Sequence, residues 1–182
     1  MPDKIALVVG PTGATGGPIA AALARRSGWH VYGMSRNPPS GEAPFTHVAA
    51  DLTDPASCRR ALASIEPVTH AFFAARAPFR EGGVEDVEGN VAMLAATLDA
   101  LASRAEALDH VHLLEGIKWY GMHLGPYPTP SREDDPRHLP PTFPRHECHG
   151  ACLPLRSCLR GRRTRRMTRQ ISSSEFDPSR VL

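Results

Sequence analysis

Apolar residues in the first 114 positions form five short runs with the length and composition of buried strands, at residues 5–9, 30–34, 46–50, 68–75 and 110–114. Turn-forming residues bound these runs, which favours strands. Strands alternating with helical patterns indicate an α/β domain with a doubly wound parallel sheet, because right-handed crossovers place helices on both faces. The expected strand order is 3-2-1-4-5. A ligand would then lie at the carboxyl ends of the first and fourth strands, where that order reverses.

Three helices are expected between these strands. The first follows the first strand, is rich in alanine and ends at Ser27-Gly28. The second begins at Asp54-Pro55, which supplies an N-cap followed by proline at the first helical position. The third and longest follows Gly82-Gly83, and its apolar residues step by four and three. They predict one continuous apolar face that covers the sheet, made of Val87, Val91, Leu94, Leu98 and Leu101.

A glycine-rich turn joins the first strand to the first helix, reading Gly10-Pro11-Thr12-Gly13-Ala14-Thr15-Gly16-Gly17. Phosphates bind where backbone N–H donors and the positive end of a helix come close, and side chains would block that approach. The spacing G-x-x-G-x-x-G is a variant of the usual dinucleotide fingerprint, in the expected setting of strand, turn and helix. The turn predicts a Rossmann-like domain that binds a dinucleotide; the alternative is a turn with a structural role only. The expected cofactor-binding residues here are Gly10, Thr12, Gly13, Thr15 and Gly16.

The end of the second strand favours NADP over NAD. A site for NAD usually places an acidic residue about twenty positions past the glycines, where it binds the ribose hydroxyls. This chain has Met34-Ser35-Arg36 there instead, and a guanidinium suits a 2'-phosphate in charge and in geometry. Ser35 and Arg36 are therefore expected cofactor-binding residues, although Arg36 could also be an exposed loop arginine.

The end of the third strand, Asp51-Leu52, lies near the adenine by position. We expect both residues at the cofactor. A loop carboxylate that caps a turn is an equally good interpretation of Asp51.

Charge divides the chain into two unlike parts. Residues 1–144 hold 12 Lys and Arg against 16 Asp and Glu, whereas residues 145–182 hold nine Arg and three acidic residues. No apolar run is long enough for a membrane span, and no charged leader precedes the first strand, so a cytoplasmic protein is expected. Three of the four cysteines lie between positions 148 and 158, which does not suggest a secreted disulfide framework.

Charged and aromatic residues follow the fifth strand in the run Glu115-Gly116-Ile117-Lys118-Trp119-Tyr120-Gly121. Hydride transfer to a carbonyl-containing substrate needs a group that stabilises the developing oxyanion, normally a tyrosine or a lysine. The Tyr-x-x-x-Lys pair of short-chain dehydrogenases cannot form here. The chain has only two lysines, Lys4 and Lys118, and neither stands four residues after a tyrosine.

Several motifs together resemble the first half of the progesterone 5-beta-reductase and iridoid synthase group of extended short-chain dehydrogenases, with their sugar-epimerase-like relatives. Besides the glycine turn they are residues 32–36, 51–54, 68–73 and 88–90, and above all Gly116-Ile117-Lys118-Trp119-Tyr120-Gly121 leading to Gly125-Pro126. The resemblance covers residues 6 to about 143. It implies NADPH-dependent reduction of enone or carbonyl substrates, with Lys118 as the catalytic lysine near the substrate oxygen.

The catalytic tyrosine of that group has no counterpart. It belongs to a Phe-Tyr-Tyr stretch, and this chain reads Phe143-Pro144-Arg145 at the corresponding place. Tyr120 is the phenol nearest to Lys118 in the sequence that could substitute for it. Members of the group are also about twice as long. Two hypotheses therefore stand: an NADPH-dependent reductase of a small molecule, and a catalytically silent NADP-binding fragment.

The change of composition near residue 144 predicts two parts: an NADP-binding domain at 1–143, truncated after the fifth strand, and a basic, disordered tail at 144–182. An abrupt change inside a motif favours a tail that arises from a shifted reading frame or altered splicing. An arm for nucleic acid is less favoured, because Phe176 is its only aromatic residue. The tail histidines and cysteines lack a paired ligand spacing, so no metal site is expected.

Overall fold

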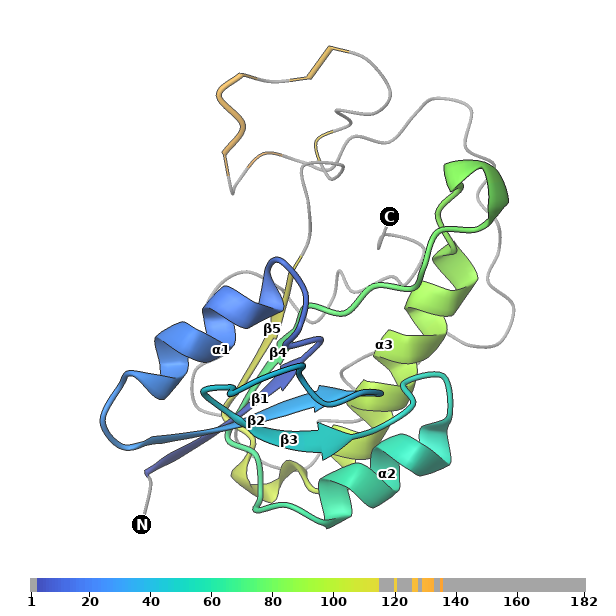
Figure 1. Ribbon diagram of the computed structural model, residues 1–182. Coiled ribbons are helices and arrows are strands. Elements are labelled where there is room, and N and C mark those ends of the chain that lie inside the picture. Colours follow the sequence, from blue (N-terminus) through green and yellow to red (C-terminus); the bar gives the residue numbers. More distant parts are fainter. Residues whose placement is uncertain (1–2, 115–119, 121–125, 128, 133–134, 136–182) are drawn as a thin grey trace.

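The computed structural model describes residues 3–114, 120, 126–127, 129–132 and 135. These residues contain one parallel sheet in the order β3-β2-β1-β4-β5, as predicted (Figure 1). Each strand lies within two residues of its predicted bounds. The strands are β1 Lys4–Val9, β2 Trp29–Ser35, β3 Thr46–Ala49, β4 His70–Phe73 and β5 His110–Leu113.

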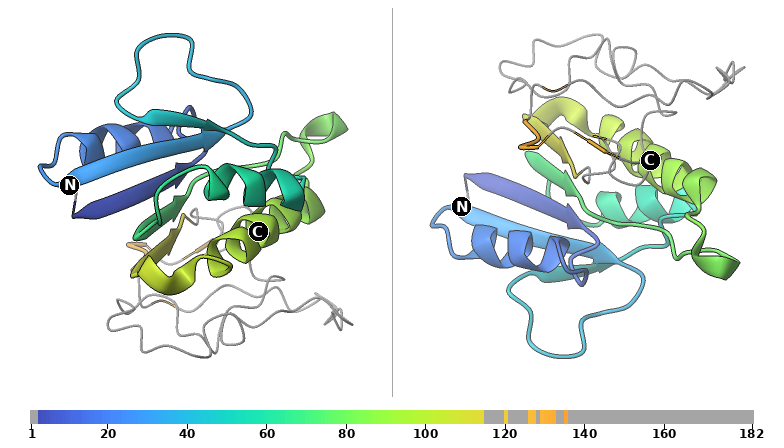
Figure 2. Two further views of the ribbon diagram at one scale, coloured as in Figure 1. Left: turned by 90° about the horizontal axis from the view of Figure 1, so that it is seen from below. Right: turned by 90° about the horizontal axis from the view of Figure 1, so that it is seen from above.

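Helices cover the two faces of the sheet unequally. On one face α1 (Gly16–Ala24) packs on β1 and β2, and on the other α2 (Pro55–Ala63) and α3 (Val87–Ala102) lie side by side (Figure 2). Two short 3-10 helices, η1 (Glu81–Gly83) and η2 (Ala105–Ala107), precede and follow α3. Among the described residues no helix has both the length and the apolar character that a membrane crossing requires.

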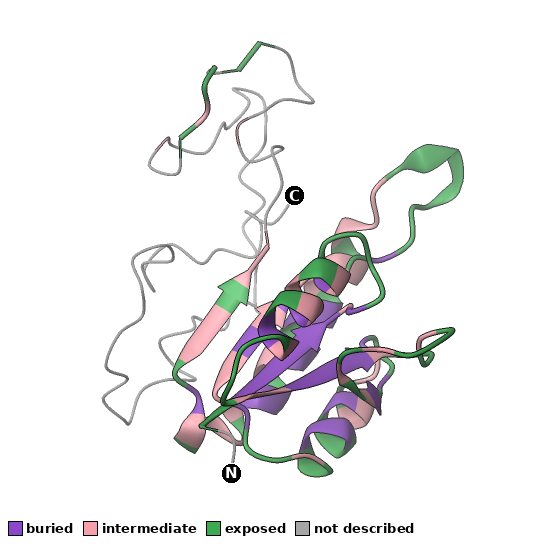
Figure 3. Cartoon of the chain, turned by 60° about the vertical axis from the view of Figure 1, so that its left-hand side comes forward, coloured by how far each residue is buried: buried purple, intermediate pink, exposed green. Residues whose placement is uncertain are grey.

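Alternation along β1 divides the core between the two faces. Ala6 and Val8 pack towards α1, whereas Ile5, Leu7 and Val9 belong to the larger cluster under α2 and α3. Most residues of β1 and β2 are accordingly buried, while β5 is only half-buried (Figure 3). A central parallel strand has to be apolar on both faces, which explains the unbroken apolar run in the sequence.

The predicted start of α2 is confirmed. The Asp54 side chain accepts a hydrogen bond of 2.8 Å from the backbone N–H of Ala56, and Pro55 is the first helical residue. Proline costs nothing there because that N–H has no partner within the helix.

The predicted apolar face of α3 was only partly right. Leu94 and Leu101 are buried as expected, but Val87, Val91 and Leu98 are only half-buried. The buried face also includes small and polar side chains: Met93, Ala96, Thr97 and Ala100. This helix packs against both the sheet and α2, so its buried face is wider than one stripe of large residues. Thr97 is accommodated there because its hydroxyl donates to the Met93 carbonyl at 2.9 Å.

A loop rather than a helix connects β2 to β3, and one aromatic ring anchors it. The Phe45 ring packs on the α1 side of the sheet. A Cβ added to Gly33 of β2 would lie 2.3 Å from Phe45 Cδ2 and 2.9 Å from Pro11 Cγ. Gly33 therefore leaves the space beside the strand that the side chains of Phe45 and Pro11 occupy.

Candidate cofactor site

The glycine turn lies at the carboxyl end of β1, where the neighbouring strands are β2 and β4. Gly10 has φ +80°, and its N–H donates to the Met34 carbonyl at the end of β2. A Cβ on Gly10 would come within 2.9 Å of the Ala75 backbone, just past β4. The first glycine is thus needed both for its left-handed conformation and for a close approach of two backbones.

Gly16 has a different role, because it lets α1 start directly over the turn. A Cβ at this buried position would lie 2.1 Å from the Gly10 carbonyl oxygen. Gly13 has no such constraint: its Cβ would meet only that same oxygen at 3.4 Å, which is ordinary contact. Thr12, Gly13 and Thr15 are exposed.

The N-terminus of α1 is suited to an anion. Thr15 occupies the N-cap position, but its side chain makes no capping hydrogen bond, and the first turn contains no acidic residue. The positive end of the helix is therefore not compensated by its own side chains. A dinucleotide phosphate is the kind of group that this end would bind.

The end of β2 carries Ser35 and Arg36, with His47 of β3 beside them. The Ser35 hydroxyl donates to the Asn37 carbonyl at 2.9 Å and closes the turn from which Arg36 extends. His47 Nε2 lies 3.2 Å from both the hydroxyl and the carbonyl oxygen of Ser35. Arg36 itself is exposed. The sequence alone did not indicate His47, because its place depends on the β2–β3 register, which pairs it with Gly33, two residues before Ser35.

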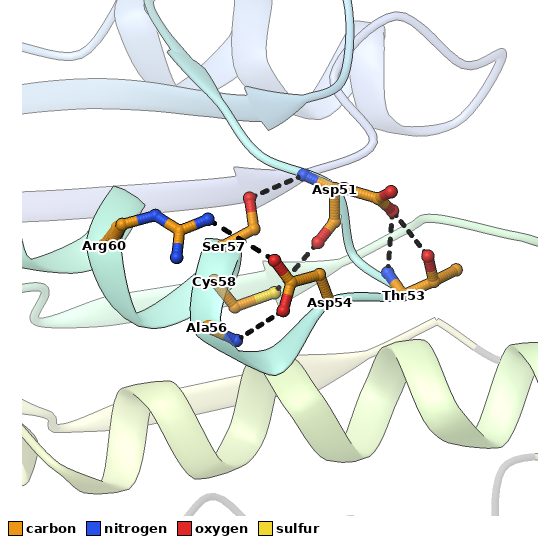
Figure 4. A network of polar contacts seen from close by, with 7 residues as sticks. All are labelled: Asp51, Thr53, Asp54, Ala56, Ser57, Cys58 and Arg60. Atoms are coloured by element: carbon orange, nitrogen blue, oxygen red, sulfur yellow. Dashed lines mark hydrogen bonds and ion pairs between the residues drawn. The ribbon is translucent and has the colours of Figure 1, made fainter.

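Asp51 follows β3 and organises the turn into α2 (Figure 4). Its carboxylate accepts hydrogen bonds from the Thr53 hydroxyl at 2.7 Å and the Thr53 N–H at 2.9 Å. These bonds hold the pKa of Asp51 below its ordinary value, and the charge of Arg36 adds a smaller effect in the same direction. The carboxylate thus caps a turn, as one of the two interpretations expected. The Leu52 side chain is buried in the core.

The end of β4 borders the glycine turn from the other side. The Ala74 N–H donates to the Val9 carbonyl at 2.9 Å, and the Ala77 N–H donates to Asn90 Oδ1 of α3 at 2.7 Å. Asn90 therefore fixes the segment after β4. Asn90 belongs to the motif at residues 88–90, but its role could not be predicted, because an amide on a helix does not show which backbone it will bind.

Lys118 lies outside the described residues, as do the tail histidines and cysteines. Tyr120 is described and half-buried. Among the described residues no group of three or more potential ligands could hold a metal ion.

A doubly wound sheet with a glycine turn at its switch point defines the class of nucleotide-cofactor-binding α/β domains. Residues 6–148 match the NAD dependent epimerase/dehydratase family, and the chain belongs to that family.

Among curated proteins the chain is similar to 3-oxo-Delta(4,5)-steroid 5-beta-reductase of Arabidopsis thaliana, with 35% identity over 146 residues, 76% of this chain and 36% of that protein. It is also similar to (S)-8-oxocitronellyl enol synthase of Catharanthus roseus, with 31% identity, 77% of this chain and 38% of that protein. These relatives confirm the resemblance to the steroid 5-beta-reductase and iridoid synthase group. The chain spans well under half the length of either one.

Among solved structures a mutated uronate dehydrogenase is similar in fold, with a TM-score of 0.56 and 18% identity. The similarity covers 74% of this chain and 46% of that one. It supports the Rossmann-like architecture alone.

Proposed function

We propose that the chain binds NADP(H) and forms the cofactor-binding part of a reductase of enone or carbonyl substrates. The observation that carries this proposal is the contact between Gly16 and the Gly10 carbonyl, which any side chain would prevent. It keeps the uncapped start of α1 directly over the turn at the switch point. The fit is therefore to a phosphate-bearing dinucleotide. Gly10, Thr12, Gly13, Thr15 and Gly16 would surround the phosphates.

Arg36 gives the preference for NADP. It follows a strand end with no acidic residue, and hydrogen bonds from Ser35 and His47 order the turn that carries it. A guanidinium binds a phosphate through paired N–H donors, whereas it has no equivalent partner in the free ribose hydroxyls of NAD. Asp51 and Leu52 would border the adenine through their loop.

Bound NADPH supplies a hydride to the substrate in reductases of this kind. The chain contributes Lys118, whose ammonium group would stabilise negative charge on the substrate oxygen. Its place directly after the β5 segment, in the motif shared with the reductase group, supports this role.

A silent NADP-binding fragment is the second candidate. The observation that favours it is that the chain spans 36% of the steroid reductase and 38% of the enol synthase. We propose residues 1–143 as the cofactor-binding domain and residues 144–182 as a separate basic tail. We propose that the chain is cytoplasmic and that its partner is a small-molecule substrate. We propose neither a membrane nor a nucleic acid as a partner.

Cofactor affinity and turnover test these proposals separately. We expect Arg36→Ala to weaken NADPH binding about tenfold, the loss expected for one charge-assisted hydrogen bond, and to leave NADH unchanged. Arg25→Ala is the matched control, because Arg25 is exposed at the opposite end of α1. Equal losses for NADPH and NADH would refute the Arg36 role.

Turnover is followed through the loss of NADPH absorbance with small enones. Turnover that falls in Lys118→Ala, with NADPH binding intact, would support the reductase and exclude the silent fragment. Tight NADPH binding without turnover would support the fragment.

A further inference from the structure

The segment after β4 is held on both sides, which gives Arg76 a defined place. Ala75 lies against Gly10, so closely that a Cβ on the glycine would be 2.9 Å from the Ala75 backbone. Ala77 is buried and bound to Asn90 of α3. Arg76 stands between these two anchors, directly beside the glycine turn.

The side chain of Arg76 is exposed and stacked on an aromatic ring. Its Cζ lies 3.8 Å from the centre of the Phe79 ring, and Phe79 is itself 51% exposed. Such stacking orients a guanidinium while leaving its N–H edge open to a ligand. No carboxylate among the described residues forms an ion pair with Arg76.

Arg80, four residues later, shows the contrasting case. It is also exposed, but it lies 2.6 Å from Asp86 and 3.1 Å from Glu88. Its charge is balanced by its own neighbours. Two arginines on one short segment thus differ in whether their charge is already compensated.

We propose that Arg76 binds the pyrophosphate of the dinucleotide, from the β4 side of the glycine turn. The inference rests on the proposed function, since it needs a cofactor whose phosphates lie over Gly10. An anion at the switch point between β1 and β4 lies at the carboxyl end of β4, where Arg76 begins. Arg36 and Arg76 then divide the cofactor: Arg36 binds the 2'-phosphate and Arg76 the pyrophosphate.

Three probes separate the two arginines in direct binding measurements on the full chain. NADPH carries both phosphate groups, NADH only the pyrophosphate and adenosine 2'-monophosphate only the 2'-phosphate. We expect Arg76→Ala to weaken NADPH and NADH by the same factor, about tenfold, and to leave adenosine 2'-monophosphate unchanged. Arg76→Lys should lose less dinucleotide affinity than Arg76→Ala, because lysine keeps the positive charge but lacks the paired N–H donors of the guanidinium. The loss should shrink at high salt.

Arg80→Ala is the matched control and should bind all three probes like the unsubstituted chain. Thermal unfolding of each variant shows whether the fold is kept. Phe79→Leu provides a second variant, which removes the stacking but leaves Arg76 intact. It should weaken the binding of both dinucleotides less than Arg76→Ala does.

Unchanged affinity of Arg76→Ala for both dinucleotides would overturn the inference while leaving the proposed function standing. So would an effect confined to the KM of an anionic enone, since Arg76 would then serve the substrate. If the unsubstituted chain binds no dinucleotide, the proposed function fails and the inference with it.

Discussion

Alanine substitutions in the glycine turn should affect stability and cofactor binding differently, and Gly16 and Gly13 provide a matched pair. In Gly16→Ala the new Cβ would lie 2.1 Å from the Gly10 carbonyl oxygen, against 3.4 Å for ordinary contact. The neighbour is backbone and cannot rotate away, so α1 has to shift by about 1.3 Å. In Gly13→Ala the new Cβ would lie 3.4 Å from the same carbonyl oxygen, so nothing has to move.

Overpacking of a buried site costs roughly 1–3 kcal/mol, and we expect about 2 kcal/mol of unfolding free energy to be lost in Gly16→Ala. For a chain of this size that lowers the midpoint of thermal unfolding by on the order of 5 °C. Gly13→Ala should change stability by less than about 0.5 kcal/mol, the usual range for a surface substitution. Gly13→Ala should nevertheless weaken NADPH binding, because the new methyl group would lie where the cofactor phosphates are expected to approach the exposed turn.

Thermal unfolding followed by circular dichroism and NADPH titration by fluorescence measure the two effects. Gly41→Ala is the control for both, since its Cβ would meet nothing within 4 Å. An unchanged unfolding midpoint in Gly16→Ala would refute the packing argument. Full NADPH affinity in Gly13→Ala would show that this glycine is not needed for phosphate approach.

Two further predictions concern stability. Asn90→Ala leaves the Ala77 N–H without its 2.7 Å acceptor and should cost about 1 kcal/mol in urea unfolding; a loss no larger than that of an exposed alanine substitution would contradict it. Burial lowers the pKa of His70 and His110 from 6.5 in the folded chain, helped by the charge of each neighbouring histidine and, for His70, of Lys4. The unfolded chain then binds more protons than the folded chain. The contribution of these two histidines to the free energy of unfolding is therefore fully present above about pH 6.5 and is lost as the pH falls below it. His70→Gln should reduce this slope, measured down to about pH 5, and an unchanged slope would count against the assignment.

Topology was the part of the fold that the sequence predicted best. Buried strands separated by crossovers allow few parallel arrangements, and the order 3-2-1-4-5 followed from that restriction. The face of α3 was harder. Ala96, Thr97 and Ala100 carry no strong apolar signal, and they are buried on a helix that packs against α2 as well as the sheet.

The candidate site divides in the same way. Gly10 and Gly16 could be found from spacing because their constraint is local to a strand, turn and helix. His47 and Asn90 could not, because each acts on a segment that only strand register or helix packing brings near. Asp51 was found but left with two roles, and the Thr53 hydrogen bonds explain one of them.

The packing of Phe45 against Gly33 has a consequence for protein engineering. Residues 36–45 begin with the arginine proposed to select NADP and end with the ring that seats the loop on the sheet beside the glycine turn. A graft that exchanges only the first few residues, to convert cofactor preference, keeps this anchor. A graft of the whole loop removes Phe45 and leaves the space beside Gly33 unfilled. The residue proposed to select the cofactor and the residue that attaches the loop to the sheet therefore lie at opposite ends of the same segment, and an exchange of this loop should retain Phe45.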